Sequence, residues 1–275
     1  MKIDEIRRFA TDIRVETLRA LTHLGFGHYG GSMSVVEALA VLYGAVMRVK
    51  PDEPQWPQRD NFVLSKGHAG PALYSTLALK GYFPREMLMT LNQNGTRLPS
   101  HPDRLLTPGV DATTGSLGQG VSLAAGMALS HRLAGRPNRV FCMLGDGELN
   151  EGQCWEAFQF IAHHNLNNLM LFIDYNKQQL DGTLEEVIRP FDLAEKFTAF
   201  GFDAVTVKGD DVAAIYDAVA PAREGAQRPR VVILDTIKGQ GVPCLERRSN
   251  AHHLRLTDDV KAEILDAIAQ LEATR

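Results

Sequence analysis

The chain has 275 residues, of which 44% are hydrophobic and 23% are charged, so it can bury the core of a single domain spanning 1–275. Its formal net charge of −4 excludes the clustered positive surface that nucleic acids and anionic membranes require. We expect a cytoplasmic protein, because the N-terminus forms no signal peptide, no stretch is long enough to span a bilayer, and three cysteines without C-x-x-C spacing suggest neither disulfides nor zinc.

The predicted elements begin with two helices. Apolar residues at helical spacing predict a helix from Ile3 that ends before Gly25. The spacing of Ser34 and Glu37 predicts a capping box, which would open a second helix to about Met47.

Strand and helix patterns then alternate. Short apolar runs predict strands at 62–64, 140–144, 169–173, 204–207 and 231–234. Helical patterns lie at 69–80, 119–134, 151–164, 192–200 and 211–224, and a last one runs through Val260, Ile264, Leu265, Ile268 and Leu271. The alternation predicts an α/β fold in which helices cover both faces of a parallel sheet. We interpret the aperiodic segments 94–118 and 239–256 as long loops near a site.

Oxygen-bearing side chains follow two successive predicted strands. Asp146 follows the run 140–144 within Gly-Asp-Gly, and Asn176 follows the run 169–173. In an open parallel sheet ligands bind at the carboxyl ends of strands, so these two side chains would lie close together. A carboxylate, an amide oxygen and phosphate oxygens are ligands that Mg²⁺ prefers. A lone Gly-Asp-Gly, however, is usually only a turn.

The wider pattern resembles the thiamine diphosphate enzymes, whose cofactor motif begins with Gly-Asp-Gly and closes roughly thirty residues later with asparagine. Asp146 and Asn176 have this spacing. The segments that are similar to transketolase in particular are 145–152, 174–182, 65–69, 98–102 and 113–120. The resemblance covers essentially residues 5–252 and implies a thiamine-diphosphate-binding fold of the pyrophosphate type.

The resemblance also implies the ligands of the cofactor and metal. The metal would be bound by Asp146, Asn176 and the backbone carbonyl of Gln178, with Mg²⁺ expected and Ca²⁺ or Mn²⁺ as alternatives. Thiamine diphosphate would be bound by His68, Gly115, Ser116, Leu117, Gly145, Asp146, Gly147, Glu148, Asn176 and His252. Glu151 matches a glutamate that bonds its counterpart across a dimer interface, although a solvated first-turn acid is the plain interpretation.

Four histidines match catalytic positions of the family: His28, His68, His101 and His252. Histidine suits this chemistry, because ketol transfer removes a proton from a donor hydroxyl and later returns one. His253 remains the alternate to His252, because the residues around this pair differ from those of the family. The neighbouring Arg247 and Arg248 are a solvated charge pair or contact a substrate phosphate or another acid. The histidines that match nothing catalytic are His23, His131, His163 and His164.

Ser116 and Tyr29 stand where transketolases commonly have proline, which leaves the substrate open. The resemblance implies transfer of a two-carbon ketol unit from a ketose to an aldose, each a sugar or sugar phosphate. A C-terminal transketolase subunit carrying the pyrimidine-binding half would be the partner, in an α2β2 assembly. One alternative is the alpha-type subunit of a 2-oxoacid dehydrogenase, which gives no reason for the histidine set. Another is a non-catalytic thiamine-diphosphate-binding module.

Overall fold

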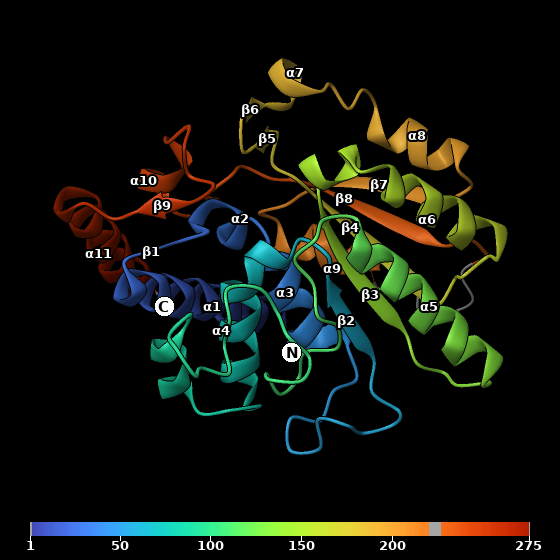
Figure 1. Cartoon of the computed structure of the whole chain (residues 1–275), viewed down its shortest axis with the longest axis horizontal. Coiled ribbons are helices and arrows are strands. Elements are labelled where there is room, and N and C mark those ends of the chain that lie inside the picture. Colours follow the sequence, from blue (N-terminus) through green and yellow to red (C-terminus); the bar gives the residue numbers. More distant parts are fainter. Residues whose placement is uncertain (1, 220–226, 275) are drawn as a thin grey trace.

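The computed structural model describes residues 2–219 and 227–274 and is built around a five-stranded parallel sheet (Figure 1). The order across the sheet is β2-β3-β4-β8-β7, and every neighbouring pair is parallel. The five predicted strands are thus all present, close to their expected bounds. They are β2 (Asn61–Leu64), β3 (Val140–Gly145), β4 (Leu169–Tyr175), β7 (Asp203–Lys208) and β8 (Arg230–Asp235).

Side chains of the sheet alternate between two hydrophobic cores, one on each face. In β3, Phe141 and Met143 belong to the first core, whereas Cys142 and Leu144 belong to the second. The predicted α/β fold with helices on both faces is confirmed. The first core contains residues of α1 (Ile3–Leu24), α3 (Val36–Val41), α4 (Gly70–Lys80) and α9 (Val212–Val219), and the second contains residues of α5 (Gln119–Leu133), α6 (Gly152–His163) and α8 (Leu193–Ala199). The predicted end of the helix over 211–224 lies outside the described residues.

The chain reverses its direction of winding between β4 and β8. From β2 to β4 each strand adds beside the last, with α5 and α6 on the side of the second core. β7 then takes the far edge, and β8 returns to pair with β4 after α9 crosses on the side of the first core. In open α/β sheets ligands bind at the carboxyl ends of the strands where the winding reverses. The residues that follow β4 and β8 are therefore the first place to look for a site.

Two short elements tie the region after α1 to the predicted loop 239–256. β1 (Phe26–Gly27) pairs antiparallel with β9 (Leu254–Arg255), and α10 (Pro243–Glu246) lies within the same loop. The last helical pattern forms α11 (Asp258–Ala273), which packs against α1 and buries Ile264 and Ile268. The segment 94–118 is irregular, as predicted.

The apolar stretch Tyr29–Val46 is long and apolar enough to cross a membrane, contrary to our expectation that no stretch is. It consists of α2 (Tyr29–Met33), α3 and a π-helix (Leu42–Val46). Because 89% of the stretch is buried inside the fold, it is a core segment of this structure. Buried core segments can be as long and as apolar as segments that span a membrane.

The predicted capping box at Ser34 is wrong. α3 begins after Val35, whose side chain makes no cap hydrogen bond. Ser34 Oγ instead donates to Asp174 Oδ2 at 2.7 Å, and Glu37 forms an ion pair with Arg14 at 2.6 Å. Both side chains are engaged by buried partners from other elements, which spacing along the chain cannot reveal.

Candidate functional site

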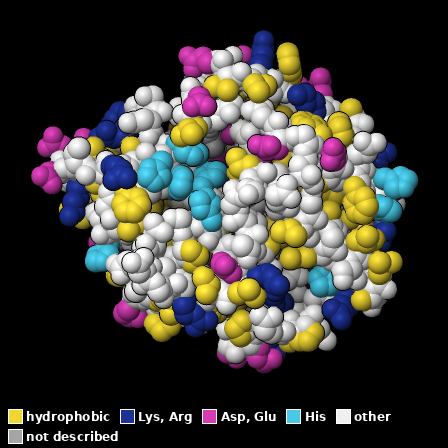
Figure 2. Space-filling model, in the orientation of Figure 1, with side chains coloured by type: hydrophobic (Ala, Val, Ile, Leu, Met, Phe, Trp, Pro, Cys, Tyr) yellow, Lys and Arg dark blue, Asp and Glu magenta, His cyan; other side chains and the backbone are white. Residues whose placement is uncertain are grey.

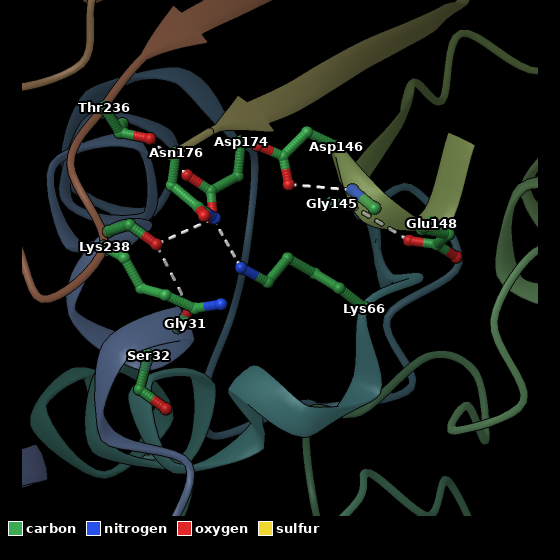
Figure 3. Close-up of polar contacts among 12 residues, drawn as sticks. Gly31, Ser32, Lys66, Gly145, Asp146, Glu148, Asp174, Asn176, Thr236 and Lys238 are labelled. Atoms are coloured by element: carbon green, nitrogen blue, oxygen red, sulfur yellow. Dashed lines mark hydrogen bonds and ion pairs between the residues drawn. The ribbon is translucent and has the colours of Figure 1, made fainter. Parts of the chain in front are cut away.

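Asp146 lies directly after β3 at the carboxyl edge of the sheet (Figure 3). Its Oδ1 accepts the Gly147 backbone N–H at 2.8 Å, and its Oδ2 accepts the Lys177 backbone N–H at 2.7 Å. These bonds hold the carboxylate against the turn that follows β4. Burial, and then the nearby charge of Asp174, raise the pKa of Asp146 to about 7. A bound cation would favour the ionised form of this carboxyl group.

The turn after β4, which is bonded to Asp146 through the Lys177 N–H, carries further oxygen atoms. Asn176 Nδ2 donates to Asp174 Oδ2 at 2.9 Å, and Asn176 Oδ1 accepts the Gln178 backbone N–H at 3.2 Å. The Gln178 backbone carbonyl accepts from Lys238 Nζ, which follows β8, at 3.0 Å. The three predicted metal ligands therefore lie in two adjacent turns, at the ends of β3 and β4.

Two buried lysines flank these oxygen atoms. Lys66, after β2, is 1% exposed and donates from Nζ to Asp174 Oδ2 at 2.5 Å. Burial, and then repulsion by Lys66, lower the pKa of Lys238 to about 8. Two ammonium groups held at the same edge of the sheet favour a bound anion such as diphosphate.

Four other histidines surround His28. The ring centroid of His28 lies 5.4 Å from that of His68, 5.8 Å from His101, 5.4 Å from His252 and 4.8 Å from His253. They come from four segments that are far apart in the sequence, and Figure 2 shows a cluster of histidine side chains beside a hollow of the surface. All four predicted catalytic histidines are thus brought together. We call these five residues the histidine cluster.

The interior of the histidine cluster disfavours positive charge. Chiefly through burial, the pKa of His28 is lowered to about 4 and that of His252 to about 3. Burial also lowers the pKa of His101, and it lowers that of His68 well below the usual value. These four rings are therefore neutral near pH 7, and each offers one N–H donor and one nitrogen acceptor.

The structure distinguishes His252 from His253. The His252 ring lies 5.0 Å from that of His68, and its Nδ1 is buried without a hydrogen-bond partner among the described residues. His253 is exposed, and its ring lies 6.1 Å from that of Phe26. Buried polar atoms normally have a partner, so a ligand would complete the environment of His252. The geometry therefore favours His252 as the residue that meets a ligand.

The glycine-rich loop before α5 packs against the segment that contains His68. A Cβ on Gly67 would lie 2.9 Å from the Gly115 nitrogen, and a Cβ on Gly115 would lie 3.4 Å from the His101 ring. In the same loop Leu117 is half-buried and Ser116 is exposed. The predicted cofactor-binding residues of this loop thus lie beside two members of the histidine cluster.

Glu148 binds the protein with both carboxylate oxygens. Oε1 accepts from Ser65 Oγ at 2.5 Å and from the Gly118 backbone N–H at 2.9 Å, while Oε2 accepts the Gly145 backbone N–H at 3.0 Å. Glu148 therefore joins the loop before α5 to the ends of β2 and β3. The predicted contact of Glu148 with the cofactor would have to come from its backbone.

Gly30 joins the two segments that contribute His28 and His252. Its N–H donates to the Ala251 carbonyl at 2.8 Å, and its carbonyl accepts the Gly239 N–H at 3.1 Å. A Cβ on Gly30 would lie 2.7 Å from the Ala251 oxygen and from Lys238 Cγ. Only a glycine allows this close approach without displacing the neighbouring backbone.

Several residues considered from the sequence lie outside this site. Glu151 is exposed at the start of α6, next to Gly118, and its interface role stays a prediction. Arg247 is exposed, and Arg248 forms an ion pair with Glu263 at 2.9 Å. Among the described residues, no ring contact joins the remaining histidines to the histidine cluster: His23, His131, His163 and His164.

Three charged residues of the site have no role in the predictions from the sequence. These are Lys66, Asp174 and Lys238, which end or closely follow buried strands. A charged residue at the end of an apolar run is the pattern that indicates Asp146. The same pattern at the other strand ends would have identified these three.

The predicted metal ligands are one carboxylate, one amide oxygen and one backbone carbonyl. Within 2–219 and 227–274, no group of three or more His, Cys, Asp or Glu residues is arranged to hold a metal. Mg²⁺ does not require such a group, because it takes one or two carboxylates together with phosphate and water oxygens. The residues present therefore fit a divalent cation that is shared with a diphosphate.

Oxygen atoms, lysines and neutral histidines at the carboxyl edge of a doubly wound sheet fit the class of proteins that bind a phosphorylated cofactor. Residues 6–268 match the family described as transketolase, thiamine diphosphate binding domain. The chain belongs to this family.

Two relatives of similar length are named as subunits. The chain is 46% identical over 269 residues to a 6-deoxy-6-sulfo-D-fructose transketolase subunit from Clostridium sp. (strain MSTE9), covering 98% of this chain and 96% of the relative. It is 36% identical over 250 residues to a subunit of the apulose-4-phosphate transketolase from Phocaeicola vulgatus, covering 90% and 89%. The transketolase structure from Campylobacter jejuni superposes with a TM-score of 0.90 at 29% identity, covering 98% of this chain. This chain spans only 43% of that transketolase.

Proposed function

We propose that this chain is the N-terminal subunit of a two-subunit transketolase, which transfers a two-carbon ketol unit from a ketose or its phosphate to an aldose or its phosphate. The observation that supports this most is the position of the histidine cluster, in the same site as the strand-end oxygens. A site that only bound a metal diphosphate would need no such set of neutral rings. Proton transfer to and from sugar hydroxyls does need them.

The cofactors of this proposal are thiamine diphosphate and a divalent metal. Asp146, Asn176 Oδ1 and the Gln178 carbonyl would hold the metal, Mg²⁺ first and Ca²⁺ or Mn²⁺ as alternatives. His68, His252 and the two buried lysines would face the diphosphate. When bound, thiamine diphosphate supplies a carbon that adds to carbonyl groups and stabilises negative charge.

The histidines would move protons at the sugar hydroxyls. His28 and His101 would accept a proton from a donor hydroxyl and return one to the product, and the neutral state of both rings near pH 7 supports this role. A bound diphosphate would raise the pKa of the neighbouring histidines towards neutral pH, since a nearby negative charge favours the protonated ring. Binding would thus prepare the histidine cluster for acid and base catalysis.

We propose that a second polypeptide supplies the pyrimidine-binding half in an α2β2 assembly, with Glu151 at the contact between copies of this chain. This proposal is supported by a comparison of lengths. The chain spans 96% of a relative that is named as a subunit, but only 43% of the transketolase chain from Campylobacter jejuni. We treat residues 1–275 as one thiamine-diphosphate-binding domain. We also place the protein in the cytoplasm, a reducing compartment in which free cysteines such as Cys142, Cys154 and Cys244 persist.

The names of two relatives bear on the substrate. One is named for 6-deoxy-6-sulfo-D-fructose and the other for apulose 4-phosphate, and both compounds are ketoses with an anionic group. We therefore propose a ketose with a terminal anion as the donor. Pentose phosphates are the first class to test, and a sulfonated ketose is the second.

The test is an assay of the purified chain with and without its partner, in the presence of thiamine diphosphate and Mg²⁺. Ketol transfer by the mixture, but not by either protein alone, would support the proposal. Transfer by this chain alone would refute the two-subunit proposal, and decarboxylation of 2-oxoacids would indicate the dehydrogenase alternative. Cofactor binding without turnover in the mixture would indicate a non-catalytic module. Asp146→Ala serves as the inactive control.

A further inference from the structure

Asp174 is the most densely bonded side chain of the site, although it touches no predicted substrate position. Its carboxylate is 0% exposed at the end of β4. Oδ2 accepts from Ser34 Oγ at 2.7 Å, Lys66 Nζ at 2.5 Å and Asn176 Nδ2 at 2.9 Å. Oδ1 accepts from Thr236 Oγ1 at 2.5 Å. Figure 3 shows Lys66 and Asn176 reaching this carboxylate from different sides.

Stability alone gives little reason for this arrangement. A buried ion pair such as Lys66 with Asp174 loses the hydration of both charges, and apolar residues of similar size are often as stabilising. The carboxylate does, however, fix the orientation of its neighbours. Because it only accepts hydrogen bonds, each neighbour must turn a donor atom towards it. The four donors come from the segment before α3, the end of β2, the turn after β4 and the end of β8.

The neighbour for which direction matters most is Asn176. An amide has one end that donates and one that accepts, and only its oxygen can bind a cation. Because Asp174 takes the Nδ2 end, Asn176 Oδ1 must point away from it. Oδ1 there accepts one backbone N–H, from Gln178, which leaves its second lone pair free for a cation. Asp146, at the end of the neighbouring β3, contacts this turn by accepting the Lys177 N–H.

We propose that Asp174 is a positioning residue, which fixes the amide of Asn176 so that its oxygen faces the metal position. The inference rests on the proposed function, because it assumes that Asn176 binds the metal. Asp174 also holds the Lys66 ammonium at its own carboxylate, so Lys66 stays at a fixed place beside the cofactor instead of pairing with Asp146. Without Asp174, Asn176 can turn its nitrogen towards the metal, and a cation repels that end.

The first experiment compares Asp174→Asn with the wild-type chain by titration with Mn²⁺ in the presence of thiamine diphosphate, followed by electron paramagnetic resonance. Metal affinity should fall roughly 10- to 100-fold, the range typical when a group that orients a metal ligand is removed. Thr236→Val is the matched control. It removes one donor from the same carboxylate but leaves Asn176 bonded, so it should keep wild-type affinity.

The second experiment separates positioning from a merely structural role. The double variant Asp174→Asn with Asn176→Asp places a carboxylate at the ligand position, and both of its oxygens can bind metal whichever way it turns. Mn²⁺ affinity should recover relative to Asp174→Asn. Equal affinity of Asp174→Asn and wild type, or no recovery in the double variant, overturns the inference. A wild-type chain that binds no Mn²⁺ would instead overturn the metal site of the proposed function, and the inference with it.

Discussion

Asp146→Asn should stabilise the metal-free chain at pH 8 while abolishing metal binding. The carboxylate is 3% exposed, and its pKa is raised from 3.8 to about 7 by burial and by Asp174. At pH 8 the folded chain therefore holds a buried negative charge that the unfolded chain holds in water. Asparagine has the same shape without that charge.

The size of the effect follows from the pKa shift. A shift of about three units corresponds to about 4 kcal/mol of destabilisation, at 1.36 kcal/mol per unit. The asparagine also loses one acceptor, since its Nδ2 would face a backbone N–H of Gly147 or Lys177, at a cost of about 1–3 kcal/mol. A net gain of about 1–3 kcal/mol remains.

The sign of the pH dependence is defined by the raised pKa. Below the unfolded value of 3.8 the carboxyl group is protonated in both states and costs nothing. As the pH rises towards the folded value of about 7 the unfolded state ionises first, so wild-type stability falls, and above it the loss is complete. The advantage of Asp146→Asn should therefore be greatest at pH 8 and shrink steadily towards pH 4.

Urea unfolding in EDTA at pH 8 and pH 5 measures this difference, and calorimetry with Mg²⁺ and thiamine diphosphate measures binding. Asp60→Asn is the matched control, because that buried carboxylate pairs with Arg48 at 2.8 Å and its loss should destabilise the chain at both pH values. An Asp146→Asn variant less stable than wild type at pH 8, or one that keeps Mg²⁺-dependent binding, would refute the reasoning.

Three further predictions concern the histidines and one buried ion pair. In the assembled enzyme, His68→Ala should lower turnover roughly 100- to 10,000-fold. His163→Ala, on a helix end away from the site, should leave turnover unchanged. Steady-state assays measure both, and normal turnover in His68→Ala would remove this residue from the mechanism. His252→Ala should lower cofactor affinity and turnover far more than His253→Ala, and the reverse order in calorimetry and turnover assays would reassign the pair. Arg14→Ala should lower the free energy of unfolding by about 3–5 kcal/mol, because it leaves the buried carboxylate of Glu37 without its cation. An unfolding curve that matches wild type would contradict this.

The sheet and the Asp146–Asn176 pair could be predicted because both depend on strands that follow one another in the sequence. β3 and β4 are neighbours joined by one helix, so the ends of two successive apolar runs meet at one edge of the sheet. The histidine cluster depended on resemblance instead. His28, His101 and His252 stand in irregular segments and His68 in a single 3-10 turn, so no periodicity indicates which side chains converge.

Other parts of the site could not be predicted, for two physical reasons. Ser34 and Lys66 reach Asp174 across a fold whose strand order was unknown, and local spacing assigned Ser34 to a helix cap instead. The choice between His252 and His253 depends on how an aperiodic loop turns, which the Gly30 to Ala251 backbone bond and the β1–β9 pairing determine. Both contacts are long-range.

The pairing of β1 with β9 also determines which part of the site can form last during synthesis. Residues 26–27 leave the ribosome early but have no partner until residues 254–255 follow. This delay in pairing β1 with β9 comes from the time of synthesis and not from the length of chain between them. Each doubling of loop length adds only about 0.6 kcal/mol to the entropy cost of closure. A nascent chain can form the sheet and the Asp146 turn, yet it holds His28 without His252. A ligand that contacts both histidines can therefore bind only after β9 has been synthesised.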